Sequence, residues 1–181
     1  MLPRYILYKG KQRPFLKGNC KIFTDTVPTL TKYGFMNMAR SLKVEGNPWV
    51  AFDDESFRGN FKIFKEGDHT NLGTFAQCIS SIQEITVCLE NPEIVLYEHV
   101  NYYGKAVSIF EVTRDMKGTG LDDVVSSHKV KKGAWILYKN TGLRGTRMFT
   151  TENHPNHCYL GWNDQMSSLK PVTDEDCEKP Q

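Results

Sequence analysis

Residues 48–52 read Pro-Trp-Val-Ala-Phe, and a matching stretch, Ala-Trp-Ile-Leu-Tyr, occupies residues 134–138. The second tryptophan follows the first by 86 residues, and the same offset relates Phe-Arg-Gly at 57–59 to Leu-Arg-Gly at 143–145. Self-similarity at a fixed period is the signature of repeated structural units, and it decides the fold class before any other feature. The chain is therefore predicted to consist of two halves of similar design.

Each half divides again into two related segments. Residues 6–23 resemble residues 50–64, and residues 95–104 resemble residues 136–145. The result is four motifs of roughly forty residues each, too short to bury a core alone, so the motifs should fold in pairs.

The residue pattern within each motif is typical of β-strands. Short runs such as 5–8, 49–52, 94–97 and 135–138 mix β-branched and aromatic residues between turn residues. Four glycines follow an aromatic residue or leucine closely, where a folded hairpin needs a positive φ; they are Gly18, Gly59, Gly104 and Gly145. Antiparallel strands in fours favour Greek keys, two per β-sandwich. The link between the halves is expected near residues 88–92, where Asn-Pro breaks any strand.

Composition excludes several classes of protein. Of the 181 residues, 39% are hydrophobic and 12% aromatic, which is typical of a packed globular chain. The net charge of +2 is too small to indicate nucleic-acid binding by itself. No apolar run approaches the length of a membrane span, and the first residues do not begin a signal peptide. Five cysteines without a CxxC pair predict reduced thiols. We therefore expect a cytoplasmic location, with non-classical secretion as an alternative.

Two hexapeptides concentrate oxygen donors. Residues 122–127 read Asp-Asp-Val-Val-Ser-Ser, and residues 163–168 read Asn-Asp-Gln-Met-Ser-Ser. Calcium takes roughly six to eight oxygen ligands, which such a stretch supplies at short range. The simpler alternative is a solvated loop whose hydroxyls make local turn hydrogen bonds. Because the pattern occurs twice, each time just before a strand-like segment, it predicts a pair of cation sites.

Other features have simpler interpretations. The three tryptophans are expected to be core or domain-face aromatics. His154, His157 and Cys158 could bind zinc, but a structural zinc site needs four ligands and no second cluster accompanies them. A basic cluster could contact an anionic surface, although lysines also protect sheet edges; it comprises Lys9, Lys11, Arg13, Lys17 and Lys21. No hydrolase, metalloprotease or P-loop motif is present, so no enzyme is expected.

The motifs resemble those of the βγ-crystallins. Residues 97–104 resemble the YE-x-x-x-F-x-G hairpin of that family, residues 132–138 its G-x-W-x-x-Y start, and residues 57–68 its F-x-G-x-x-x-x-L-x-x-G-E-Y pattern. The resemblance covers roughly residues 5–172. It implies an all-β chain of two βγ-crystallin-type Greek-key β-sandwich domains, at 1–88 and 93–173. An acidic tail, residues 174–181, should follow and remain unpacked.

The resemblance also assigns the hexapeptides, because [N/D]-[N/D]-x-x-[S/T]-S is the calcium-binding motif of that family. Two shared Ca2+ sites are then implied in the second domain. One would use Asn163, Asp164 and Ser167 with Glu98 from the partner hairpin. The other would use Asp122, Asp123 and Ser126 with the backbone near Lys139. A lysine repels a cation unless only its carbonyl is used, so the Glu98 site should be tighter.

The first domain departs from the calcium motif. Residues 36–41 have Arg40 where the hydroxyl should stand, and residues 76–81 lack both acidic positions. The hairpin residues Lys9 and Asp53 compensate little, so no calcium site is expected there. The implied function is that of a non-enzymatic, calcium-binding structural or protective protein.

A second interpretation concerns interaction. Residues 44–52 also look like the amphibian epidermis differentiation-specific proteins, in which a two-domain βγ-crystallin segment precedes an aerolysin-like pore-forming domain and some members assemble with a trefoil-factor partner. The chain would then be an N-terminal interaction or regulatory module. A homo-dimer is another possible assembly, no nucleic-acid partner is expected, and membrane contact would arise only within a pore-forming assembly.

Overall fold

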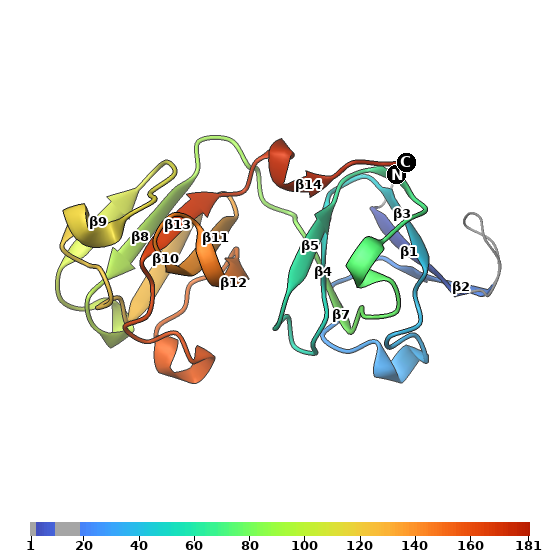
Figure 1. The fold of residues 1–181 in the computed structure, drawn as a ribbon, viewed down its shortest axis with the longest axis horizontal. Coiled ribbons are helices and arrows are strands. Elements are labelled where there is room, and N and C mark those ends of the chain that lie inside the picture. Colours follow the sequence, from blue (N-terminus) through green and yellow to red (C-terminus); the bar gives the residue numbers. More distant parts are fainter. Residues whose placement is uncertain (1–2, 10–18) are drawn as a thin grey trace. The chain divides into compact units, whose positions relative to one another are not determined.

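The structure is a computed structural model that describes residues 3–9 and 19–181. The chain forms two compact units: unit 1 contains Met1–Thr86 together with Asp174–Gln181, and unit 2 contains Val87–Thr173 (Figure 1). Among the described residues, every helical segment is a short 3-10 turn, and no helix is long and apolar enough to cross a membrane. The prediction of an all-β chain with two Greek-key units is confirmed.

Unit 1 has two sheets, with strand orders β2-β1-β3-β6 and β14-β5-β4-β7. The first sheet contains β1 (Arg4–Lys9), β2 (Asn19–Phe23), β3 (Ser41–Glu45) and β6 (Gly67–His69). The second contains β4 (Trp49–Phe52), β5 (Phe61–Phe64), β7 (Ser81–Glu84) and β14 (Cys177–Glu178). The 3-10 turns are η1 (Thr31–Tyr33) and η2 (Gly73–Phe75). Because β6 of the second motif pairs with β3 of the first, the first sheet takes strands from both motifs, as expected for motifs that fold in pairs.

Unit 2 repeats the plan with strand orders β10-β8-β9 and β12-β11-β13. Its strands are β8 (Glu93–Tyr97), β9 (Ala106–Ile109), β10 (Ser127–Lys132), β11 (Trp135–Asn140), β12 (Arg144–Thr150) and β13 (Ser168–Pro171). Its turns are η3 (Val100–Tyr102), η4 (Met116–Thr119) and η5 (His157–Leu160). In unit 2 the two motifs are joined by two isolated β-bridges, Thr113↔Leu169 and His128↔His154.

The core of each unit lies between its two sheets. In unit 1 it includes Leu7 of β1 and Trp49 of β4, and in unit 2 Leu96 of β8 and Trp135 of β11. Alternate residues along the strands point inward, as the period of a β-strand requires. Trp162 is also buried, so the expectation that the tryptophans pack in the protein interior is confirmed.

The hairpin glycines have the expected geometry. Gly59, Gly104 and Gly145 all have φ near +80°, a region that side-chain-bearing residues rarely adopt. A Cβ on Gly104 would also lie 2.8 Å from the His99 ring. Gly18 falls outside the described residues.

The prediction of an unpacked acidic tail is wrong. Residues 174–176 form η6, and β14 pairs in parallel with β5, which places the tail in unit 1. The tail packs because β5 would otherwise expose its edge, and because Lys62 and Lys65 offer positive charge there. A two-residue strand has too little periodicity to be recognised from its sequence.

Candidate metal-binding loops

The second residue of each hexapeptide has a left-handed backbone. Asp123 and Asp164 both have φ +52°, and Asn37 and Gln77 at the matching positions of unit 1 have φ +55° and +62°. Asparagine and aspartate tolerate this conformation better than other side-chain-bearing residues. The backbone therefore explains part of the acidic pattern without any metal.

The sixth residue of each hexapeptide has a structural role in its own hairpin. The Ser127 hydroxyl donates to the His99 carbonyl at 2.6 Å and accepts from the Tyr102 amide at 3.1 Å. Ser168 bonds in the same way to Asn140 and Leu143, and Ser81 does so in unit 1. Each of these hydroxyls donates one hydrogen bond and accepts another within its hairpin, which gives it a structural role that does not depend on a cation.

The fifth residue of each hexapeptide reaches across to the other loop. Ser126 Oγ donates to Asp164 Oδ1 at 3.3 Å, and Ser167 Oγ donates to Asp123 Oδ1 at 3.0 Å. The sequence prediction placed each serine with the aspartate of its own hexapeptide, whereas the structure brings each serine to the aspartate of the other hexapeptide. The exchange follows from the pairing of the motifs, since Asp164 N also donates to Val125 O across the same junction.

Backbone hydrogen bonds attach each serine to a hairpin strand. Ser126 N donates to Tyr97 O at 3.0 Å, beside Glu98, and Ser167 N donates to Tyr138 O at 3.1 Å, beside Lys139. Two groups of residues result. We call Glu98, Ser126, Asn163 and Asp164 the Ser126 site. We call Asp122, Asp123, Lys139 and Ser167 the Ser167 site.

The hairpin residues of the two sites, Glu98 and Lys139, make different contacts. Glu98 Oε2 accepts from the Lys105 amide at 3.0 Å, so this carboxylate is folded back onto its own hairpin. Lys139 Nζ donates to Gly161 O at 3.2 Å and to Gln165 Oε1, and it lies 5.4 Å from the centroid of the Trp162 ring. Its ammonium is thus held over the adjoining loop.

The donor set of the Ser167 site suits a hard cation. Asp122 Oδ1 is buried without a hydrogen-bond partner among the described residues, a costly state for an anionic oxygen unless a cation neutralises it. The aspartates and Ser167 offer only oxygen, as Ca2+ prefers. Within the described ranges, no three His, Cys, Asp or Glu side chains cluster as a metal site. A cation in these loops would therefore depend on serine and backbone oxygens as well.

Unit 1 contains a neutral counterpart of the Ser167 site. Ser80 Oγ lies 3.1 Å from Asn37 Oδ1 and 3.0 Å from the Asp53 carbonyl oxygen. Asn37 brings no charge, and the Asp53 carboxylate accepts from the Asn60 amide at 2.7 Å. The second position in unit 1 has Arg40 in place of serine. The expectation that unit 1 binds no calcium stays a prediction.

Three histidines that the zinc hypothesis considered only in part form a cluster behind the Ser126 site. His128 Nδ1 lies 2.7 Å from His157 Nε2, and the His128 and His154 rings are 5.1 Å apart. Burial lowers the pKa of His128 well below its ordinary value and that of His157 to about 4. The two facing nitrogens form a hydrogen bond in which one donates and the other accepts, and Cys158 is exposed. Sequence reasoning missed His128 because it lies 26 residues from His154.

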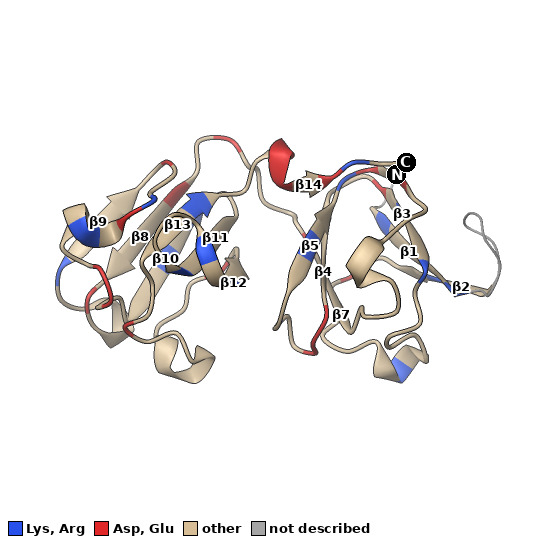
Figure 2. Cartoon of the chain, in the orientation of Figure 1, with Lys and Arg blue, Asp and Glu red and all other residues tan. Residues whose placement is uncertain are grey.

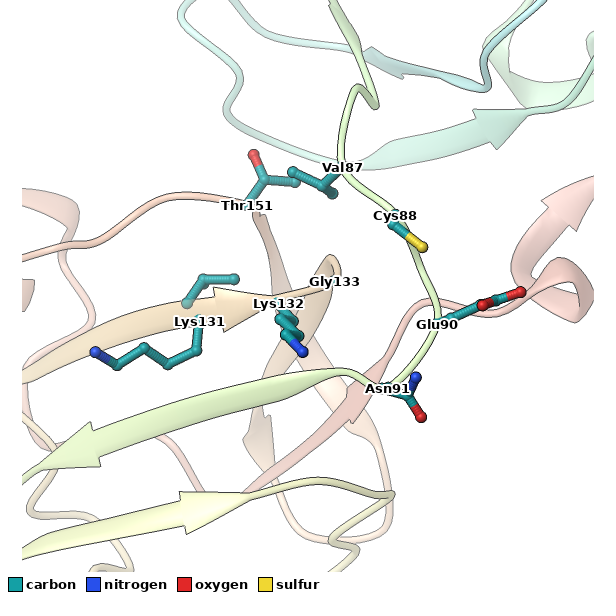
Figure 3. Close-up of a pocket in the computed structure, with 9 residues that line it drawn as sticks. Val87, Cys88, Glu90, Asn91, Lys131, Lys132, Gly133 and Thr151 are labelled. Atoms are coloured by element: carbon teal, nitrogen blue, oxygen red, sulfur yellow. The ribbon is translucent and has the colours of Figure 1, made fainter.

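Two further features, a hollow in unit 2 and the basic cluster of the first strands, do not gather side chains into a binding site among residues 3–9 and 19–181. A hollow of about 410 Å³ in unit 2 is lined by four residues between 87 and 91, by the end of β10 with Gly133, and by Thr151 (Figure 3); the four are Val87, Cys88, Glu90 and Asn91. Its charged side chains, those of Glu90, Lys131 and Lys132, are all exposed. Of the basic cluster, Lys9 donates to the Gly34 carbonyl at 3.3 Å and Lys21 lies over the Tyr33 ring. Lys11, Arg13 and Lys17 lie outside the described residues.

Comparison with known proteins gives matches over both units. The family model described as Beta/Gamma crystallin matches residues 6–85 and 93–172. The Epidermal differentiation-specific protein of Cynops pyrrhogaster is 36% identical over 158 residues, covering 86% of this chain and 47% of that protein. The chain thus spans about half the length of that relative. Gamma-crystallin N of Mus musculus is 30% identical over 175 residues, covering 92% of this chain and 91% of that protein.

Solved structures give similar names. A beta gamma crystallin from Ciona intestinalis is 30% identical and covers 44% of this chain and 99% of that chain, with a TM-score of 0.43. Geodin, a beta-gamma crystallin from Geodia cydonium, is 17% identical and covers 95% of this chain and 100% of that chain, with a TM-score of 0.39.

Proposed function

Because the chain belongs to the beta/gamma crystallin family, we propose that it is a non-enzymatic structural protein whose unit 2 binds Ca2+ at the Ser126 and Ser167 sites. The crystallin names of its relatives support a structural rather than a catalytic role. The calcium part of the proposal depends on the chain's own residues.

The exchanged serine–aspartate pairs are the observation that carries the calcium proposal. Each pair joins oxygens from two different motifs, so an ion held there would link the motifs as well as neutralise Asp123 or Asp164. A ligand that binds only the folded state stabilises it by mass action. Bound Ca2+ would therefore raise the stability of unit 2, and the expected role is that of a stabiliser rather than a sharp switch.

The Ser167 site is proposed as the tighter of the two, in place of the Glu98-containing site expected from sequence. It has two carboxylates, and Asp122 Oδ1 finds no hydrogen-bond partner in the part of the chain that the structure describes. The Ser126 site has one aspartate, Asp164, whose Oδ2 already accepts from Asn163 Nδ2 at 2.6 Å, and a Glu98 carboxylate engaged by its hairpin. Lys139 opposes binding at the Ser167 site, but its ammonium is held by Gly161 and Gln165.

Calcium titration of the full chain tests the proposal. We expect isothermal calorimetry and terbium luminescence to report binding in the wild type, weaker binding in Ser167→Ala, and little change in Ser80→Ala, the matched serine beside uncharged Asn37. Hydrogen exchange should show protection by Ca2+ confined to unit 2. Absence of binding at millimolar Ca2+, or equal losses in Ser167→Ala and Ser80→Ala, would refute the assignment.

A second proposal concerns the context of the chain. The Cynops relative extends well beyond the matched region, which favours a two-domain module within a longer protein. The names of the relatives given above mention neither a pore-forming activity nor a trefoil partner, so those expectations and a homo-dimer stay predictions. The full-length transcript decides the matter: a reading frame that stops at Gln181 would exclude the module.

A further inference from the structure

The segment 174–181 closes one edge of a sheet in unit 1 by a contact unlike the others. Strand β14 pairs with β5 through two residue pairs, Cys177↔Ile63 and Glu178↔Phe64 (Figure 1). This pairing is parallel, whereas the other pairings between described strands are antiparallel. An open edge of β5 would present free backbone groups to any other strand.

Charge complements the backbone pairing. Lys62 Nζ lies 3.1 Å from Glu178 Oε1, and Lys65 Nζ lies 3.1 Å from Asp174 Oδ2. Figure 2 shows acidic residues on η6 and at the end of β14, and a basic band on β5, the strand with which β14 pairs. Beyond the strand, Gln181 N donates to Asp68 O at 2.9 Å. The β5 edge thus recognises an extended acidic segment by hydrogen bonds and by two lysines.

The ion pairs that hold the segment are weak ones. Both ion pairs are at the surface, with 85% of the Asp174 side chain exposed, and such pairs contribute little and are screened by salt. Cys177, at 7% exposure, is the one buried residue between 174 and 181. A segment with few buried contacts opens at a lower free energy than the core.

We propose that residues 174–181 are an electrostatically held strap, which opens without unfolding of unit 1 and uncovers at β5 a basic edge that accepts an acidic extended strand. In the closed state the chain's own tail is the occupant. Strand addition at a sheet edge is a general mode of peptide recognition, in which backbone bonds give affinity and side chains give selectivity. The strap also protects the edge from unwanted pairing. This inference does not depend on calcium.

Reactivity of the Cys177 thiol in the full chain reports on the strap. Burial, with Asp174 and Asp176, raises the pKa of Cys177 to about 11, so the docked thiol should resist alkylation at neutral pH. Exposed Cys20, Cys88 and Cys158 serve as internal references in site-resolved mass spectrometry. We expect Cys177 to react at least about tenfold more slowly than these references in the wild type at low salt.

Charge reversal then tests what holds the strap. Lys62→Glu with Lys65→Glu should speed alkylation of Cys177 by roughly three- to tenfold, and so should salt in the wild type. Lys21→Glu, on β2 in the other sheet, is the matched control and should change nothing. Adding Glu178→Lys and Asp174→Lys to the reversed lysines should restore protection, which a general loss of folding would not permit.

Three results would overturn the proposal. Cys177 could react as fast as Cys158 in the wild type, which would mean that the tail is not docked. Reversal of Lys62 and Lys65 could leave the Cys177 rate unchanged, which would mean that the ion pairs do not hold the strap. A rate that depends on protein concentration would place the tail on β5 of a second copy instead.

Discussion

At the scale of the residue, adjacent serines of one hexapeptide have different partners and should respond differently to mutation. Ser127 is buried and bonds to two backbone groups of its hairpin, whereas Ser126 faces Asp164. Ser127→Ala should lower the free energy of unfolding by about 1–3 kcal/mol with or without Ca2+, because it leaves buried groups unpaired. Ser126→Ala should mainly reduce the stabilisation by Ca2+. Urea unfolding with and without Ca2+ measures both, and an identical pattern for the two variants would contradict this division.

The sequence could identify the residues of these loops but not their partners. Spacing within a hexapeptide shows that oxygens are close along the chain, and it cannot show that Ser126 faces Asp164 rather than Asp123. That choice depends on how the paired motifs cross. Glu98 was assigned from the resemblance, as the residue after the hairpin tyrosine, but its carboxylate accepts from the Lys105 amide, a contact that only the folded hairpin creates. The histidine cluster was missed for the same reason.

At the scale of the element, the folded hairpin between β8 and β9 depends on Gly104. Its φ of +80° and the nearby His99 ring leave no room for a side chain. Gly104→Ala should therefore destabilise unit 2 by about 1–3 kcal/mol, the cost of a strained backbone conformation. Gly118→Ala is the matched control, because a Cβ there meets nothing within 4 Å. Thermal melting compares the two, and equal melting temperatures would show that the hairpin adapts.

Most strands could be predicted because they belong to a repeated pattern. The four β-branched and aromatic runs reappear as β1, β4, β8 and β11, and their neighbours follow at the same offsets. Strand β14 has no counterpart in the repeat. It exists because β5 supplies a free edge and two lysines, which are tertiary conditions that the acidic composition of residues 174–181 does not reveal.

At the scale of the whole molecule, the two units should differ in their response to acid. Unit 2 buries His128 and His157 in hydrogen-bond contact and packs His154 against them, and burial lowers the pKa of all three. The folded state therefore takes up these protons at lower pH than the unfolded state does. Stability from such groups is fully present above their ordinary pKa of about 6.5 and is lost as the pH falls through the folded value.

For His157 the folded pKa of about 4 sets the window, so unit 2 should lose stability between roughly pH 6.5 and pH 4. The shift corresponds to about 3 kcal/mol. Hydrogen exchange of the calcium-free chain across this range should show unit 2 opening before unit 1. His157→Gln should flatten the pH dependence of unit 2 at the cost of some stability at neutral pH, whereas His99→Gln, at an exposed position, should leave it unchanged. Parallel losses in the two units, or the same slope in His157→Gln, would mean that the buried cluster does not govern acid stability.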